Sequence, residues 1–290
     1  MKVLNFGSLN IDFVYGVTHF VRGGETISSR NMEIFPGGKG LNQSIALAKS
    51  GVETWHAGAV GEDGEILLET MKEAGVHAEL VSRLPGRTGH AIIQRDPSGQ
   101  NCILLFGGTN QRNTKMRVDE VLEHFSEGDF LVLQNEINEI GYIMEKAHEK
   151  GMTIVLNPSP MDEKIETYPL DYVDYFLLNE VEAEELCGKR ETDEELLQAV
   201  ADRFPESRIV LTLGEKGSVY KDENEMIEQP IFRVPVVDTT AAGDTFTGFF
   251  IGGIMQGETP KEAMAHAAKA SSIAVSRPGA APSIPFRREL

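Results

Sequence analysis

The sequence predicts an α/β fold: a mostly parallel central sheet flanked by helices on both faces, with a small antiparallel β lid. Short apolar runs alternate with segments whose apolar residues recur at helical spacing, which is typical of a parallel sheet covered on both faces. Two stretches, 13–34 and 88–107, instead show paired strand patterns with no helix between. No linker or repeat interrupts the 290 residues, so we expect one domain over 1–290, with the lid inserted from these two stretches.

The alternation can be followed from the N-terminus. Residues 2–12 (KVLNFGSLNID) predict a strand ending in a polar loop, and 40–52 predict a helix that stops at Lys-Ser-Gly. In the first lid stretch no helical spacing is present, and in the second Asp96-Pro-Ser-Gly predicts a hairpin turn. The remaining pattern predicts, in order, strand 54–64, helix 65–76, strand 129–136, helix 140–151, and strands at 153–160, 175–180 and 208–217 before the C-terminal helices.

Composition excludes several classes of function. With 27 Lys and Arg against 45 Asp and Glu, the net charge is −18, which repels nucleic acid and anionic membranes but permits a phosphate ligand neutralised by a metal ion. No apolar run approaches a membrane span of about 18 residues, and the N-terminus lacks the apolar stretch of a signal peptide. The cysteines, Cys102 and Cys187, lie far apart without metal-ligand spacing. We therefore expect a cytoplasmic protein with reduced thiols.

GSLNID follows the first predicted strand. Ligands of open parallel sheets bind beyond the carboxyl ends of the strands, so Asn10 and Asp12 are placed to contact one. Their acceptors and amide donor suit vicinal hydroxyl groups. A helix cap or an Asx-turn explains the same residues, and the motif alone leaves both interpretations open. It is not a dinucleotide fingerprint, because G-x-G-x-x-G is absent.

Three further motifs end strands or begin helices. PGGKGLNQS places glycines before a helix whose next turn carries Asn42, which favours either a bound electronegative atom or a plain glycine turn; it lacks Walker A spacing. In LLNEVEAEEL, Asn179 is either a helix N-cap or, with Glu182, lies near a metal-bound phosphate. TLGEKG (212–217) is a strand end and glycine turn that is equally ambiguous.

DTTAAGDTFTG (238–248) is the most informative motif. Small residues would leave the backbone N–H groups of Ala241, Ala242 and Gly243 free to converge at a helix start as an anion hole. A carboxylate beside such a hole is poorly suited to holding phosphate alone. It suits phosphoryl transfer, in which Asp244 takes a proton from a hydroxyl while the hole stabilises the transferring group. The alternative is an ordinary N-cap aspartate.

Together these motifs resemble the ribokinase family of sugar and nucleoside kinases, from residue 2 to about 286. Both long signatures are present, GGKGLNQS with Gly51 and Gly61 at the expected distances, and DTTAAGDTFTG. GSLNID, GGETI, LNPSP, LNEVEAE, TLGEKG and SRPGAAPSIP also match. Two positions depart from the pattern. Ala241 stands where the family commonly has glycine, which we expect to cost nothing, and 106–114 (FGGTNQRNT) is unusually polar and basic.

The resemblance implies roles for the matching positions. Asp244 would be the catalytic base, with Ala242 and Gly243 in the anion hole. The other implied sites are the sugar site of Asn10, Asp12, Gly38, Lys39, Asn42 and Glu136; the ATP site of Asn179, Thr212, Gly214 and Gly217, with Glu182 near Mg²⁺; and a monovalent-cation site of Asp238, Thr240, Ala274, Arg277, Gly279 and Ser283.

The function implied by the resemblance is ATP-dependent transfer of the γ-phosphoryl group to a sugar primary hydroxyl, D-ribose at O5 being expected first, with K⁺ as activator. The lid would close over the sugar, where Ala91 and Ile103 would limit its size, and would pair with a second subunit in a homodimer. Alternatives within the family are a fructose, deoxyribose or nucleoside (adenosine or pseudouridine) kinase. An inactive sugar-binding regulator is the alternative from another class, and the retained Asp244 argues against it.

Overall fold

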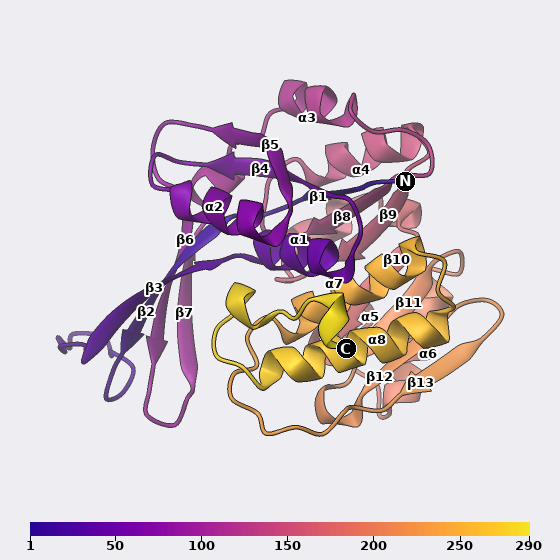
Figure 1. The fold of residues 1–290 in the computed structure, drawn as a ribbon. Coiled ribbons are helices and arrows are strands. Elements are labelled where there is room, and N and C mark those ends of the chain that lie inside the picture. Colours follow the sequence, from indigo (N-terminus) through magenta and orange to yellow (C-terminus); the bar gives the residue numbers. More distant parts are fainter.

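The computed structural model describes all 290 residues and contains a nine-stranded sheet, which we call the main sheet (Figure 1). Its strand order is β13-β12-β11-β10-β9-β8-β1-β4-β5. The strands from β5 to β11 pair in parallel, and the hairpin β12–β13 adds an antiparallel edge. The strands are β1 (Val3–Phe6), β4 (Thr54–Val60), β5 (His77–Arg83), β8 (Phe130–Gln134), β9 (Thr153–Asn157), β10 (Tyr175–Asn179), β11 (Arg208–Thr212), β12 (Ser218–Lys221) and β13 (Met226–Gln229).

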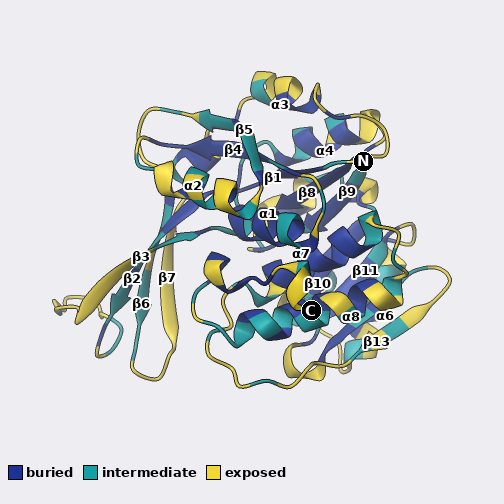
Figure 2. Ribbon diagram, in the orientation of Figure 1, coloured by how far each residue is buried: buried dark blue, intermediate teal, exposed yellow.

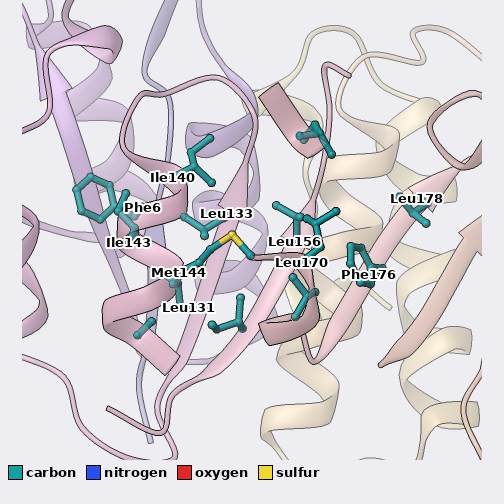
Figure 3. Close-up of a cluster of buried hydrophobic side chains, with 14 of the residues drawn as sticks. Phe6, Leu131, Leu133, Ile140, Ile143, Met144, Leu156, Leu170, Phe176 and Leu178 are labelled. Atoms are coloured by element: carbon teal, nitrogen blue, oxygen red, sulfur yellow. The ribbon is translucent and has the colours of Figure 1, made fainter. Parts of the chain in front are cut away.

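Helices cover both faces of the main sheet, as predicted. Successive side chains of a strand point to opposite faces, so Leu131 and Leu133 of β8 join one apolar cluster and Val132 joins the other. Figure 3 shows part of the first cluster. The first cluster contains residues of α3 (Lys115–Leu122), α4 (Ile140–Glu149), α5 (Glu180–Cys187) and α6 (Asp193–Arg203). The second contains residues of α1 (Lys39–Ser50), α2 (Glu65–Ala74), α7 (Ala242–Met255) and α8 (Pro260–Val275). None of these helices combines the length and apolar character that crossing a membrane requires.

A second, four-stranded sheet projects from the main body, in the order β3-β2-β6-β7 (Figure 1). The predicted lid strands are present, but the prediction of a wholly antiparallel sheet is wrong for the central pair, because β2 and β6 run parallel. Between β2 and β6 the chain forms strands β4 and β5 of the main sheet. Parallel neighbours in a sheet require a long connection of this kind. The bounds are β2 (Asn10–Gly16), β3 (Asn31–Gly37), β6 (Gly89–Arg95) and β7 (Asn101–Phe106).

The second sheet is far more exposed than the main sheet (Figure 2). Every residue of β7 is exposed, including the apolar residues from Ile103 to Phe106. Strand pairing places Ile92 opposite Leu104 and His90 opposite Phe106, so these side chains share one face. This surface therefore presents apolar side chains that the chain itself leaves uncovered.

Helices α1 and α7 pack unusually closely, because two glycines of α7 face α1. A methyl group at Gly248 would overlap Ala46, and one at Gly252 would overlap Ser50. The close approach brings the start of α7, near the C-terminus of the chain, against the start of α1. It therefore joins the two long sequence motifs in one place.

Candidate active site

A cavity of about 240 Å³ lies where the ends of the parallel strands meet the starts of α1 and α7. Strand carboxyl ends are where ligands of open parallel sheets bind, and helix starts present free N–H groups. The polar residues lining this cavity come from both long motifs and from the strand ends between them: Lys39, Asn157, Asn179, Glu182, Thr212, Thr239, Asp244 and Thr247.

Asp244 lies in the first turn of α7 and is only 7% exposed. Asn42 Nδ2 donates to its Oδ2 at 3.0 Å, and Gln43 Nε2 donates to its Oδ1 at 2.9 Å. Each carboxylate oxygen therefore receives one amide donor and keeps a lone pair for another partner. The sequence predicted Asn42 near this position but not Gln43, although both belong to GGKGLNQS.

The start of α7 differs from the predicted anion hole. The N–H of Ala242 already donates to the carbonyl of Thr239 at 3.2 Å, so it is not free. The N–H groups of Gly243 and Asp244 have no acceptor within the chain, and the space around Gly243 is open. Ala241, the N-cap residue, takes a left-handed conformation (φ 61°). Of the three predicted donors, the N–H groups of Ala241 and Gly243 are therefore free and that of Ala242 is not, and Asp244 adds a further free N–H.

The predicted sugar-contacting residues gather at the start of α1 and the root of the second sheet. Asn110 donates to Asn10 Oδ1 at 2.8 Å, which leaves the Asn10 amide nitrogen without a protein acceptor. Glu136 Oε2 accepts from the backbone N–H of Lys39 at 3.1 Å and from Ser8 Oγ. Gly38 precedes α1 with φ 97°, a conformation that favours glycine. Asn110, which the sequence did not single out, lies in the stretch that departs from the family pattern.

Burial and neighbouring charges shift the pKa values of three groups at this site. Burial, and then the neighbouring Glu136, raise the pKa of Asp12 to about 7. Burial also raises the pKa of Glu136. For Lys39 burial acts to lower the pKa, but the carboxylates of Asp244, Glu136 and Glu182 outweigh it and the pKa is raised. Lys39 is therefore a cation held among three carboxylates.

The structure supports the cap interpretation of Asn179 without removing it from the cavity. Asn179 Oδ1 accepts from the Glu182 N–H at 2.9 Å, and Glu182 Oε2 accepts from the Asn179 N–H at 3.0 Å, which is a reciprocal capping box. Both residues also line the cavity. No group of three or more metal-ligating side chains is present, so a metal ion here would need ligands from a bound molecule.

A second cavity of about 690 Å³ adjoins the first. Three of the four residues of the predicted nucleotide site, Thr212, Gly214 and Gly217, line it, whereas Asn179 lines only the first cavity. Gly214 (φ 53°) and Gly217 (φ 105°) take left-handed conformations, and a side chain at Gly217 would meet the Gln229 carbonyl. The wall shared by the two cavities consists of Thr212, Thr239, Ala242, Gly243 and Phe246.

The predicted monovalent-cation residues only partly converge. Asp238 Oδ1 accepts from the Thr240 N–H at 2.9 Å, and Oδ2 accepts from the Gly279 N–H at 3.2 Å. Burial alone would raise the pKa of Asp238, but these hydrogen bonds outweigh the effect of burial, and the pKa is lowered. Arg277 turns instead to Glu289 at 2.9 Å. The Asp238 carboxylate thus links the loop before α7 to the loop at Gly279. Ala274, in the last turn of α8, and Ser283, in a 3-10 turn, are both buried.

A model of the pfkB family of carbohydrate kinases matches residues 1–287. The chain is 35% identical to a ribokinase of Arabidopsis thaliana over 297 residues, covering 98% of this chain and 78% of that protein. It resembles the structure of a Thermotoga maritima ribokinase (TM-score 0.88, 34% identity, 99% and 97% of the two chains) and that of an Arabidopsis thaliana ribokinase complexed with ribose and ATP (TM-score 0.89, 32% identity, 99% and 96%).

Proposed function

This chain belongs to the pfkB family of carbohydrate kinases, and we propose that it transfers the γ-phosphoryl group of ATP to O5 of D-ribose. The observation that carries the proposal is the setting of Asp244. Two amides fix its carboxylate, two free N–H groups lie beside it, and it stands in the cavity that adjoins the one lined by the nucleotide motif. Phosphoryl transfer needs these parts, because its catalysis is mainly positioning and charge stabilisation.

The proposed reaction assigns one task to each group. A carboxylate oxygen of Asp244 takes the proton of the sugar hydroxyl as the new O–P bond forms. The bond between the γ-phosphorus and its bridging oxygen breaks, and ADP leaves with that electron pair. The N–H groups of Gly243 and Asp244, together with Lys39, would stabilise charge on the transferring group.

Magnesium fits the residues as an ion carried by the nucleotide. Glu182, oriented by Asn179, offers one carboxylate, and Mg²⁺ commonly combines one or two carboxylates with phosphate oxygens and water. When bound, the ion neutralises phosphate charge. The chain would hold it through Glu182, directly or through water.

Potassium activation is a further part of the proposal. Asp238 joins the loop before α7 to the loop around Gly279, and hard cations prefer such oxygen-rich loop segments. A bound cation would order the start of α7 and raise activity without contacting the sugar. The measurement compares initial rates in potassium chloride and tetramethylammonium chloride. Equal rates would remove the site from the proposal.

The second sheet would act as a lid and as a dimer surface. Alternation along the strands puts Asp12, Ala91 and Ile103 on the face toward the sugar site. The opposite face carries Ile92 and Leu104, whose exposure suits burial against a second copy of the chain. Under this arrangement the lid limits sugar size and the dimer braces it.

The substrate is tested with a panel of ribose, 2-deoxyribose, fructose, adenosine and pseudouridine, each with MgATP in a coupled ADP assay. A site whose polar groups, such as Asn10 and Asp12, bond a hydroxyl is penalised when that hydroxyl is missing, so ribose should exceed 2-deoxyribose at least about tenfold in kcat/KM. Fructose is limited by the apolar lid face. A tenfold advantage for another compound would replace ribose with that substrate, and no turnover at all would favour an inactive sugar-binding regulator.

A further inference from the structure

Gln43 supplies one of the two amides that hold the carboxylate of the proposed base, but the reaction described above gives it no task of its own. It lies on α1 with no exposed surface and does not line either cavity. Its Nε2 donates to Asp244 Oδ1 at 2.9 Å and to Asn157 Oδ1 at 3.1 Å. Gln43 therefore cannot touch a ligand, and any effect it has on the reaction must act through these neighbours.

Hydrogen bonds behind Gln43 fix the direction of its amide. Gln134 Nε2 donates to Gln43 Oε1 at 2.7 Å and to Asn5 Oδ1 at 3.1 Å. Asn5 in turn donates to the carbonyl of Gly40 at 2.9 Å. Both supporting side chains are fully buried, as Gln43 is. Because the Gln43 oxygen is occupied by a donor, its NH₂ group must face Asp244.

Asn157 extends the network to the far side of the cavity. Its Nδ2 donates to the Leu177 carbonyl at 2.9 Å and approaches Glu182 Oε2 at 3.5 Å. This fixes the Asn157 oxygen toward Gln43. The Gln43 amide thus stands between the carboxylate of Asp244 and the residue that contacts the carboxylate of Glu182, two groups that the proposed function uses for different tasks.

We infer that Gln43 is a positioning residue for phosphoryl transfer. It holds the carboxylate of Asp244 in a fixed orientation and at a fixed position relative to Asn157 and Glu182. The inference rests on the proposed function. Asn42 alone would leave one carboxylate oxygen without a protein donor, and the group could then rotate away from the sugar hydroxyl.

Loss of the donor should change kcat and KM unequally. The base is misplaced, so kcat falls while the KM for the sugar changes little, because Gln43 does not contact the sugar. A purely structural role for Gln43 would lower stability without lowering the kcat of the folded variant.

The test compares Gln43→Met, which keeps length but not the donor, with Ser44→Ala as a matched control. Ser44 is the next residue of α1, is fully buried, and contacts His56 at 2.7 Å rather than Asp244. We expect kcat of Gln43→Met to fall on the order of 10- to 100-fold, as for loss of a hydrogen bond to a charged group, with the sugar KM nearly unchanged. Ser44→Ala should keep both the kcat and the sugar KM of the wild type.

Gln43→Glu provides a second variant if the methionine variant does not fold. It can still accept from Gln134 but places an oxygen against Asp244, so we expect a comparable loss at pH 8 that lessens as the pH is lowered. Wild-type kcat in a folded Gln43 variant would overturn this inference alone. A wild-type chain that phosphorylates no sugar of the panel would overturn the proposed function and this inference with it.

Discussion

Strands β8 and β7 have similar sequences, FLVLQ and NCILLF, and opposite surroundings. Every residue of β8 is buried and every residue of β7 is exposed. The main sheet surrounds β8 with strands and helices on all sides, whereas β7 is the edge of a sheet that no helix covers. An apolar strand therefore becomes part of a core only when other elements pack on it. An apolar strand that stays exposed, as β7 does, is typical of a surface that binds another molecule.

Substitutions in the two regions should therefore affect different properties of the protein. The site on the main sheet is held by buried hydrogen bonds that exist before any ligand binds, so substitutions there should change the rate of the chemical step. The second sheet has few such constraints, so substitutions there should change assembly and sugar affinity.

The largest effect is expected at the main-sheet site. Asp244→Asn keeps size and a hydrogen-bonding group but removes the base, so kcat should fall on the order of 10²-fold or more, with a much smaller change in sugar KM. Steady-state kinetics with the best sugar of the panel measures it, and thermal unfolding controls for folding. Near-normal turnover would mean that Asp244 is only a helix-start residue.

The second sheet is tested by Leu104→Asp. Leu104 is 66% exposed, so the change should leave the folded monomer intact while placing a desolvated charge in the proposed dimer contact. We expect monomers in sedimentation velocity and roughly a tenfold loss in kcat/KM for the sugar. Met116→Asp, at an equally exposed apolar residue on α3, is the control and should change neither. A dimer that persists in Leu104→Asp would locate the contact elsewhere.

Asp12 lies where the two regions meet, and its pKa of about 7 predicts a pH dependence of sugar use. The protonated carboxyl accepts hydroxyl hydrogen bonds poorly, so kcat/KM should fall about tenfold per pH unit below 7. Asp12→Asn should be weaker than the wild type at pH 8 but nearly independent of pH between 5 and 8. The same slope in both proteins would assign the titration to another group, such as Glu136.

The same group predicts a stability change of defined sign. The folded pKa is raised above the unfolded value of about 3.9, so the folded state holds the proton more tightly and loses stability as pH rises from 4 through 7. Asp12→Asn should remove that cost and stabilise the chain at pH 8 by on the order of 1–2 kcal/mol, with little gain at pH 4. Urea unfolding at the two pH values measures it, and an equal gain at both would contradict the assignment.

The smallest effect is expected at Ala241. Left-handed backbone costs a non-glycine residue about 1–2 kcal/mol, partly offset by the extra chain entropy that glycine loses on folding. Ala241→Gly should therefore stabilise by about 0.5–1 kcal/mol, contrary to the expectation that alanine costs nothing there. Glu139→Gly, at the only other non-glycine residue with positive φ, is the matched comparison and should gain similarly without affecting activity. Destabilisation by Ala241→Gly would show that the alanine side chain is needed.

The sequence predicted the parallel sheet and the residues of the two long motifs, because apolar periodicity and glycine-rich turns are local signals. It did not predict that Gln43 would donate to both Asp244 and Asn157, because these residues belong to separate motifs and their contacts depend on the packing of distant elements. The parallel pairing of β2 with β6 was missed for a related reason. Local pattern specifies that a strand exists, whereas its direction beside a distant strand depends on the path of the chain between them. The bond from Ala242 to Thr239 depends on backbone angles that the residue types do not determine.

The close packing of α1 on α7 has a consequence for how the enzyme is made. The amides of Asn42 and Gln43 leave the ribosome early, and the carboxylate they hold is synthesised about two hundred residues later. A nascent or truncated chain that ends before α7 contains Asn10, the glycine turn and Lys39, but neither Asp244 nor the free N–H groups of the α7 start. Domains fold as units once enough of the chain has emerged. Under the proposed function, phosphoryl transfer would therefore begin only after α7 has been synthesised.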